Sequence, residues 1–332
     1  MRKGLRFLVL CSPLLLTSLS LMLGERLTGP AVLFRILTGT SVATDRTAFS
    51  LLMNIRLPIT LQAVLCGGLL AVSGAAMQAV LRNPLAEPYV LGVSSGSAFG
   101  IVGMSLLGIS GASWVQFSAA FVGGVLAAGL VLGGALKRRQ PLSMVKLILL
   151  GVAVNAFFSA LTMLMQSFLD PYTFTASIGL LMGEISLQGS AEIAVAALIG
   201  LPAVFLIWMR APELDILSQG HEHALTIGLA VDREMIRALL GATFSASVSV
   251  AICGIIGFVG LAAPHVVRAL WGAGHRKLFP YSFLVGGSFL VCAHLLSRLL
   301  SPDNSLPLTA VTALAGAPLF FWIIRNSGGR NG

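Results

Sequence analysis

Residues 81–100 read LRNPLAEPYVLGVSSGSAFG and lie between two long apolar runs. Arg82, Asn83 and Glu87 are polar, and Pro84 and Pro88 keep the backbone between them from continuing as a helix. From Leu91 onward the stretch is rich in Gly and Ser, which suits close packing of helices in lipid. The stretch therefore predicts a rigid polar link between two membrane helices.

The composition outside this stretch excludes an ordinary soluble protein. Of 332 residues, 56% are hydrophobic and only 10% are charged, whereas soluble domains carry about 25% charged residues. Apolar runs recur that are long enough to cross the membrane, which takes a helix of about 20 residues. We therefore expect an all-α polytopic membrane protein that forms one domain over residues 1–332.

The apolar runs predict ten membrane spans, one of them short. Their approximate bounds are 7–23, 57–79, 90–109, 114–136, 147–168, 191–209, 238–259, 260–270, 279–300 and 308–324. An even number of spans places both termini on the same side of the membrane.

The distribution of Lys and Arg predicts which side this is. If loops alternate between the two sides, the side without the termini carries five of the 21 basic residues, namely Arg26, Arg35, Arg46, Arg56 and Arg298. All the others share a side with the termini, which is therefore expected to be cytoplasmic. The net charge of +9 follows from this bias, so it is not evidence of nucleic-acid binding.

Titratable residues are scarce inside the predicted spans. All twelve Asp and Glu residues fall in loops or at span ends, which argues against an ion-coupled secondary carrier, because such a carrier needs an ionisable group at membrane depth. His294 lies within a span, and a hydrogen-bonded helix contact is favoured over a relay or ligand role. The four cysteines are interpreted as small buried apolar residues without a disulfide.

Two further stretches carry functional predictions. Residues 213–235 are too polar to cross the membrane, and Leu217, Ala224, Leu225 and Gly228 share one face of a continuous cytoplasmic helix. Such a helix either covers the bundle or fits a groove on a partner.

Residues 251–268, AICGIIGFVGLAAPHVVR, predict a broken helix that forms either a structural hinge or part of a translocation path.

Several motifs, taken in order, resemble permease subunits of the FecCD family, the type II ABC importers of iron complexes and vitamin B12. They are RLPITL at 56–61, SGAAMQAVLRNPLAEPYVLGVSSGSAFG at 73–100, GIIGFVGLAAPHVVR at 254–268, HRKLFP at 275–280 and LPLTAVTALAGAPLFFWIIR at 306–325. Together they cover the chain from about residue 50 to its end.

The resemblance implies the fold and the partners of the chain. It implies a ten-helix permease that pairs with a second permease, either an identical copy or a paralogue. Two separate ATP-binding cassette ATPases would lie beneath, and a periplasmic or lipid-anchored substrate-binding protein would dock outside. ATP and Mg would be bound by the ATPase, which agrees with the lack of a GxxxxGK[ST] motif in this chain. The chain itself is expected to perform no chemistry and to hold no metal.

The resemblance also assigns roles to particular residues. The segment that couples to the ATPase would contain Gly220, His221, Glu222, His223, Ala224, Leu225 and Gly228. The binding protein would dock on Arg56 and Arg298. The inner gate would contain Asn83, Leu85, Ser143 and Met144, and the path would be lined by Met163, Met165 and Gln166 within residues 163–183.

The chain departs from the family pattern at three positions. Ile59 replaces a second Arg, His294 lies where an Asp is usual, and Ser305 replaces a Glu. The predicted function is the permease of an importer that moves a ferric siderophore or haem across the bacterial inner membrane. Vitamin B12 is the alternative substrate, and an ion-coupled secondary transporter is the remote alternative from another class.

Overall fold

The computed structural model describes residues 2–22, 49–109, 113–136, 142–185, 189–301 and 306–327. Every regular element in these ranges is helical. In chain order they are α1 (Arg2–Met22), η1 (Leu52–Arg56), α4 (Leu57–Leu81), η2 (Pro88–Leu91), α5 (Val93–Leu106), α6 (Ser113–Ala135), α7 (Met144–Gln166), α8 (Pro171–Leu181), α9 (Ser190–Met209), α10 (Ala211–Gln219), α11 (His221–Thr226), α12 (Val231–Cys253), α13 (Val259–Trp271), α14 (His275–Leu300) and α15 (Leu308–Ser327).

Within the described ranges, six helices are long and apolar enough to cross a membrane. They are α6, α7, α9, α12, α14 and the helix that runs from Phe49 through α4. The remaining expected spans coincide with shorter apolar stretches, in α1, α5 and α15, and with the 13-residue helix α13. The all-helical membrane fold predicted from hydropathy is therefore confirmed.

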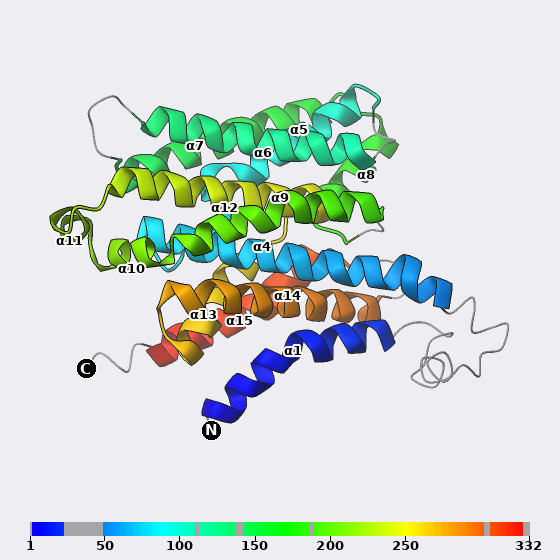
Figure 1. The fold of residues 1–332 in the computed structure, drawn as a ribbon. Helices are drawn as coiled ribbons and strands as arrows, with labels where there is room; N and C mark the ends of the chain where they lie inside the picture. Colours follow the sequence, from blue (N-terminus) through cyan, green and yellow to red (C-terminus); the bar gives the residue numbers. More distant parts are fainter. Residues whose placement is uncertain are drawn as a thin grey trace.

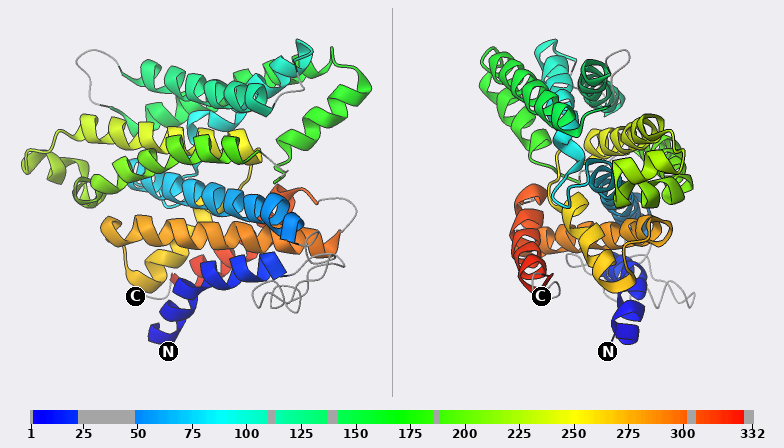
Figure 2. Two further views of the ribbon diagram at one scale, coloured as in Figure 1. Left: turned by 45° about the vertical axis from the view of Figure 1, so that its right-hand side comes forward. Right: turned by 90° about the vertical axis from the view of Figure 1, so that its left-hand side faces the viewer.

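The helices run roughly parallel and form three layers (Figure 1). One layer contains α5, α6, α7 and α8, the middle layer contains α4, α9 and α12, and the third contains α1, α13, α14 and α15 (Figures 1 and 2). The middle helix α4 packs against α12, α13 and α14, and most of its side chains are buried. The short helices α10 and α11 lie together at one end of the bundle (Figure 1).

Glycines permit α4 to approach its neighbours at backbone contact distance. A Cβ atom added at Gly67 would lie 2.2 Å from the carbonyl oxygen of Gly286 in α14. A Cβ added at Gly74 would lie 2.0 Å from the carbonyl oxygen of Gly260 in α13. Both distances are shorter than van der Waals contact, so the bundle needs glycine at these positions. Close packing through small residues is the expected way to join helices in lipid.

Helix α8 was not among the elements predicted from hydropathy. Asp170 caps it by accepting hydrogen bonds from the backbone N–H groups of Tyr172 and Thr173, and Pro171 occupies its first position. Hydrogen bonds from the side chain and backbone of Thr173 lower the pKa of the Asp170 carboxyl. With 11 residues, α8 is too short for the hydropathy criterion, but the cap sequence is a helix signal.

The prediction for two of the cysteines was wrong. Cys66 in α4 and Cys253 at the end of α12 form a disulfide in the structure, while Cys11 and Cys292 are free. The two paired residues are separated by 187 positions in the sequence. Their spacing therefore gave no signal, and only the packing of α4 against α12 brings them together.

Candidate functional site

Helices α12 and α13 are separated by a non-helical segment, Gly254–Phe258, which we call the break segment. Gly254 has φ +69° and Phe258 has φ +68°, a region that glycine adopts readily and other residues rarely do. The contact of Gly260 with Gly74 shows how deep the break lies. Gly74 precedes the end of α4 by seven residues, or about 10 Å at 1.5 Å per residue. The break therefore lies inside the bundle.

This position corrects the predicted boundary between two spans at residues 259 and 260. Helix α12 ends at Cys253, and Gly260 is already the second residue of α13. Pro264 lies within α13, which continues to Trp271. The helix thus breaks before the proline, at Gly254.

Tyr89 satisfies two backbone groups of the break segment. Its hydroxyl donates to the carbonyl oxygen of Ile256 over 2.9 Å and accepts from the N–H of Ile256 over 3.2 Å. The Glu87 carboxylate also has a hydrogen bond from the backbone of Phe258. Unpaired backbone groups are costly inside a membrane protein, so the link that follows α4 stabilises the break between α12 and α13.

A second set of contacts reaches the same segment from the other side. The N–H of Glu184 donates to the carbonyl oxygen of Cys253 over 3.1 Å. The N–H of Leu308 donates to the carbonyl oxygen of Gly183 over 2.9 Å. The Thr309 hydroxyl bonds to the carbonyl oxygens of Met182 and Ile255. The break segment is therefore joined to the link after α4, to the segment after α8 and to the start of α15.

Replacing Tyr89 with phenylalanine is expected to loosen the break segment. The change leaves the N–H and C=O of Ile256 without their partner, at a cost of about 1–3 kcal/mol for each unsatisfied group. Tyr172→Phe is the matched control, because Tyr172 is 86% exposed. Hydrogen–deuterium exchange should be faster around Ile256 in Tyr89→Phe and unchanged in Tyr172→Phe. Equal protection in the two variants would contradict the assigned contact.

The polar link quoted at the outset, residues 82–92, turns sharply after α4. Arg82 has φ +49°, and Asn83 accepts a 2.9 Å hydrogen bond from the N–H of Leu85 through its side chain. Leu85 is 52% exposed although it is apolar. Asn83 thus holds the turn, and Leu85 is exposed beside it.

The other two predicted gate residues lie at the start of α7. Ser143 is its N-cap and accepts from the N–H of Lys146, and Met144 is its first residue. Met144 packs against the same buried cluster that contains Ala86 of the link. The structure therefore places both predicted gate segments beside one cluster, while their role as a gate stays a prediction.

The segment predicted to be one continuous helix over 213–235 is three helices. Gly220 has φ +146° and separates α10 from α11, and Gly228, with φ +85°, lies between α11 and α12. Glycine tolerates these angles, so the chain turns where a regular helix would have continued. The polar segment thus folds as a compact loop at the end of the bundle (Figure 1).

This turn changes which of the predicted coupling residues are accessible. Ala224 is fully buried, as is Leu217 in α10, whereas Leu225 is 54% exposed. Ile227, in the same segment, is 57% exposed. His221 is half-buried, and Glu222, His223 and Gly228 are exposed. The expectation that Leu217, Ala224, Leu225 and Gly228 share one face of a single helix was therefore wrong. Leu225 and Ile227 form an exposed apolar pair instead.

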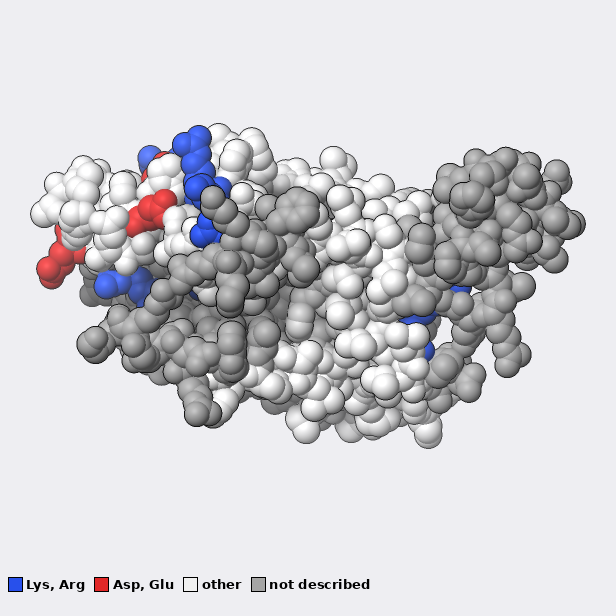
Figure 3. Space-filling view, turned by 90° about the horizontal axis from the view of Figure 1, so that it is seen from below, with Lys and Arg blue, Asp and Glu red and all other residues white. Residues whose placement is uncertain are grey.

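Charged side chains gather at this same end of the molecule. Figure 3 shows acidic and basic atoms of described residues close together at the end that carries α11. Three ion pairs lie at this end and join Arg210 to Glu213 and Glu234, and Arg237 to Glu234. Asp215 ties α10 to the start of α14 through a 2.6 Å contact with the His275 ring.

The two predicted docking arginines differ in accessibility. Arg56 is only 8% exposed, whereas Arg298 is half-buried near the end of α14. Arg298 follows His294 by four residues on α14, so the two lie on one face of this helix. Ile59 packs against the neighbouring buried cluster. Ser305 lies outside the described residues.

His294 is buried in α14, with 8% of its surface exposed. Its Nε2 atom has no hydrogen-bond partner among the described residues. The interpretation as a hydrogen-bonded helix contact is therefore not supported at this atom. The described residues contain no group of three or more metal-ligating side chains.

The predicted path residues lie at the end of α7. Met163 is 71% exposed, while Met165 and Gln166 are half-buried. The Cε atom of Met165 lies near Gly103 of α5. The exposed face of α7 also carries Val145, Leu149 and Val152. Such an apolar face is suited to lipid or to another permease, and the structure does not bring these residues together with the predicted gate.

Comparison with known protein families defines the class of protein. A family model described as the FecCD transport family matches residues 12–326. The chain belongs to the FecCD transport family and is a permease subunit of an ABC transporter.

Characterised relatives and a solved structure agree with this assignment. The Fe(3+) dicitrate transport system permease of Escherichia coli is 39% identical over 282 residues, covering 83% of this chain and 85% of the relative. The hemin transport system permease of Yersinia pestis is 34% identical and covers 88% and 87%. The vitamin B12 import system permease of Vibrio parahaemolyticus is 34% identical and covers 98% and 96%.

The solved structure shares the fold over nearly the whole chain. It is reported as an inward-facing conformation of a metal-chelate type ABC transporter, with a TM-score of 0.85 and 28% identity. The match covers 98% of this chain and 99% of that chain. The permease fold expected from the sequence motifs is thus confirmed.

Proposed function

We propose that the chain is the permease of an importer that moves an iron complex, a ferric siderophore or haem, across a bacterial inner membrane. The observation that carries this proposal is the 39% identity to the Fe(3+) dicitrate permease, together with the similarity to the hemin permease. Vitamin B12 is the second candidate, because a B12 permease aligns with 98% of the chain.

The orientation in the membrane is part of the proposal. Both termini face the cytoplasm, because most Lys and Arg residues then fall on the cytoplasmic side. The end that carries α10 and α11 also faces the cytoplasm, where a separate ATPase can reach it. Arg56 and Arg298 lie at the opposite, outer end, where a binding protein approaches.

The mechanism follows from the way in which the loop and the break are connected. The ATPase contacts the exposed pair Leu225 and Ile227, while α12 runs from this loop to the break segment. Movement of the ATPase is thus transmitted along α12 to a segment held by Tyr89 and Thr309. ATP and the loaded binding protein each favour one of two arrangements of the break segment. Switching between these arrangements alternates access to the translocation path at the interface with the second permease.

Charge reversal at Arg298 is expected to weaken docking of the binding protein. Arg298→Glu removes an attraction to acidic partner residues and adds a repulsion, so affinity should fall about fivefold or more at low salt, and less at high salt. Arg276→Glu is the matched control on the same helix, because Arg276 is exposed near the opposite end of α14. Association kinetics with the binding protein at two salt concentrations measure the effect. Equal loss in the two variants would exclude a docking role for Arg298.

The substrate is tested with the binding protein that works with this permease. Its affinity for ferric siderophores, haem and cobalamin should be measured by titration under the same conditions. The proposal expects tight binding of an iron complex and no competition by cobalamin. Preferential binding of cobalamin would support the second candidate instead.

A further inference from the structure

A groove runs along the outside of the bundle between α9 and α12. It has a volume of about 470 Å³, which lies within the range of about 300–1,000 Å³ typical of small-molecule sites. Its walls are apolar. The lining residues are Ile199, Pro202, Ala203 and Leu206 on α9 and Leu240, Gly241 and Phe244 on α12.

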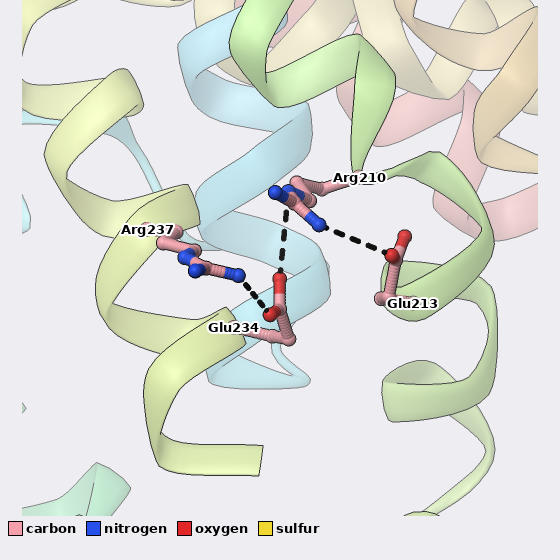
Figure 4. Close-up of polar contacts among 4 residues, drawn as sticks. All are labelled: Arg210, Glu213, Glu234 and Arg237. Atoms are coloured by element: carbon pink, nitrogen blue, oxygen red, sulfur yellow. Dashed lines mark hydrogen bonds and ion pairs between the residues drawn. The ribbon is translucent and has the colours of Figure 1, made fainter. Parts of the chain in front are cut away.

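The groove has a basic end. Arg210, the C-cap of α9, and Arg237, in the second turn of α12, both line it. Arg237 contacts Glu234 over 2.5 Å, and Arg210 contacts Glu234 over 3.7 Å and Glu213 over 3.4 Å (Figure 4). Glu234 is 5% exposed. It accepts a hydrogen bond from Arg237, whereas its contact with Arg210 is an ion pair without a hydrogen bond.

The two carboxylates do not line the groove. The charged residues that line it are Arg210 and Arg237, and the lining contains no acidic side chain. An arginine has five N–H donors in a planar fork that suits phosphate. The ion pairs described above use only some of these donors, which leaves others for an anion at the mouth of the groove.

The length of the groove also matches the thickness of one membrane leaflet. Arg210 and Arg237 lie at the end of the bundle with α10 and α11, the cytoplasmic end under the proposed orientation. From Arg210 the apolar wall extends back to Ile199, which is about 16 Å along α9 and about half of the roughly 30 Å hydrocarbon layer. A chain that enters at the level of the arginines therefore stays within one leaflet.

We propose that this groove binds one anionic phospholipid of the cytoplasmic leaflet, with its phosphate on Arg210 and Arg237 and an acyl chain between α9 and α12. A second groove, between α9 and α14, provides an internal comparison. Its volume is about 440 Å³, and Leu201, Phe205, Trp208 and Phe283 are among its lining residues, none of which is charged. It has no group that selects an anionic headgroup.

The test compares lipid retention by charge variants on the same helix. The whole transporter is placed in nanodiscs that contain equal amounts of phosphatidylglycerol and phosphatidylcholine. The lipids that it retains are then identified by native mass spectrometry. The wild type should retain phosphatidylglycerol preferentially, and Arg237→Gln should lower that preference about fivefold, as expected for one basic residue at a membrane surface. Arg233→Gln is the control, because Arg233 is exposed on α12 and does not line the groove. Equal effects of the two variants, or no preference in the wild type, would overturn the proposal.

A second pair of variants tests the acyl chain without altering charge or the ion pairs. Leu240→Trp fills the groove between α9 and α12, and Leu201→Trp fills the one between α9 and α14. Only Leu240→Trp should reduce retention of phosphatidylglycerol, and soluble glycerol phosphate should not displace the lipid. Retention that is insensitive to Leu240→Trp, or lost to glycerol phosphate, would show that the groove does not hold a lipid chain. None of these outcomes depends on the imported substrate.

Discussion

Replacing Gly74 with alanine is expected to destabilise the whole bundle. The added methyl group would lie 2.0 Å from the carbonyl oxygen of Gly260, and that oxygen belongs to the backbone of α13, so it cannot move aside as a flexible side chain could. Overpacking costs about 1–3 kcal/mol and occasionally more, and we expect Gly74→Ala to reach or exceed the upper figure. Thermal unfolding in detergent can be monitored as the loss of the monodisperse peak. The Gly74→Ala variant should unfold at a clearly lower temperature than the wild type.

The chain offers matched controls for this prediction. Gly129 and Gly133 lie in α6, and a Cβ atom added at either has no atom within 4 Å. Alanine also favours helix over glycine by about 1 kcal/mol, so Gly129→Ala should be neutral or slightly stabilising. If Gly74→Ala unfolded at the same temperature as Gly129→Ala, the close contact between α4 and α13 would be wrong.

Replacing both Leu225 and Ile227 with aspartate is expected to abolish coupling to the ATPase while the permease stays folded. Both side chains are more than half exposed, so the change should leave the core intact. If they are central interface residues, each contributes about 2 kcal/mol or more to binding, and the two together should reduce ATPase affinity by more than a hundredfold. Co-purification of the ATPase and ATP-driven transport should both be lost.

The control for this experiment is a pair of polar positions in the adjacent helix. Ser218 and Gln219 of α10 are exposed at the same end of the molecule, so Ser218→Asp with Gln219→Asp adds the same charge outside the apolar pair. Ala224→Arg is a poorer test, because Ala224 is fully buried and its replacement would disturb the loop itself. Normal ATPase binding by the Leu225 and Ile227 double variant would exclude this surface.

Hydropathy predicted most of the fold, because lipid demands long apolar helices whatever their partners. Helices such as α6, α7 and α14 lie close to their expected bounds. The position of the break was missed, because Gly254, Gly257 and Gly260 look equivalent in sequence. The break occurs at Gly254, where Tyr89 and Thr309 satisfy the freed backbone groups, and both are distant in sequence.

The candidate site was predicted less completely for a similar reason. The periodicity of residues 213–235 assumed one helix, but Gly220 and Gly228 turn the chain and leave Leu225 exposed. Periodicity cannot show where glycine will adopt a positive φ. The family resemblance predicted which segment couples to the ATPase, and that role stays a prediction. The choice among its side chains needed their exposure in three dimensions.

The most direct test of the proposed function is transport by the assembled importer. The permease, its ATPase and its binding protein are reconstituted in proteoliposomes, and uptake of the iron complex is followed with ATP, with a non-hydrolysable analogue and with a proton uncoupler. We expect uptake that requires ATP hydrolysis, persists with the uncoupler and is lost in the Leu225 and Ile227 double variant. Uptake that continues without ATP hydrolysis and collapses with the uncoupler would contradict the assignment and support an ion-coupled carrier.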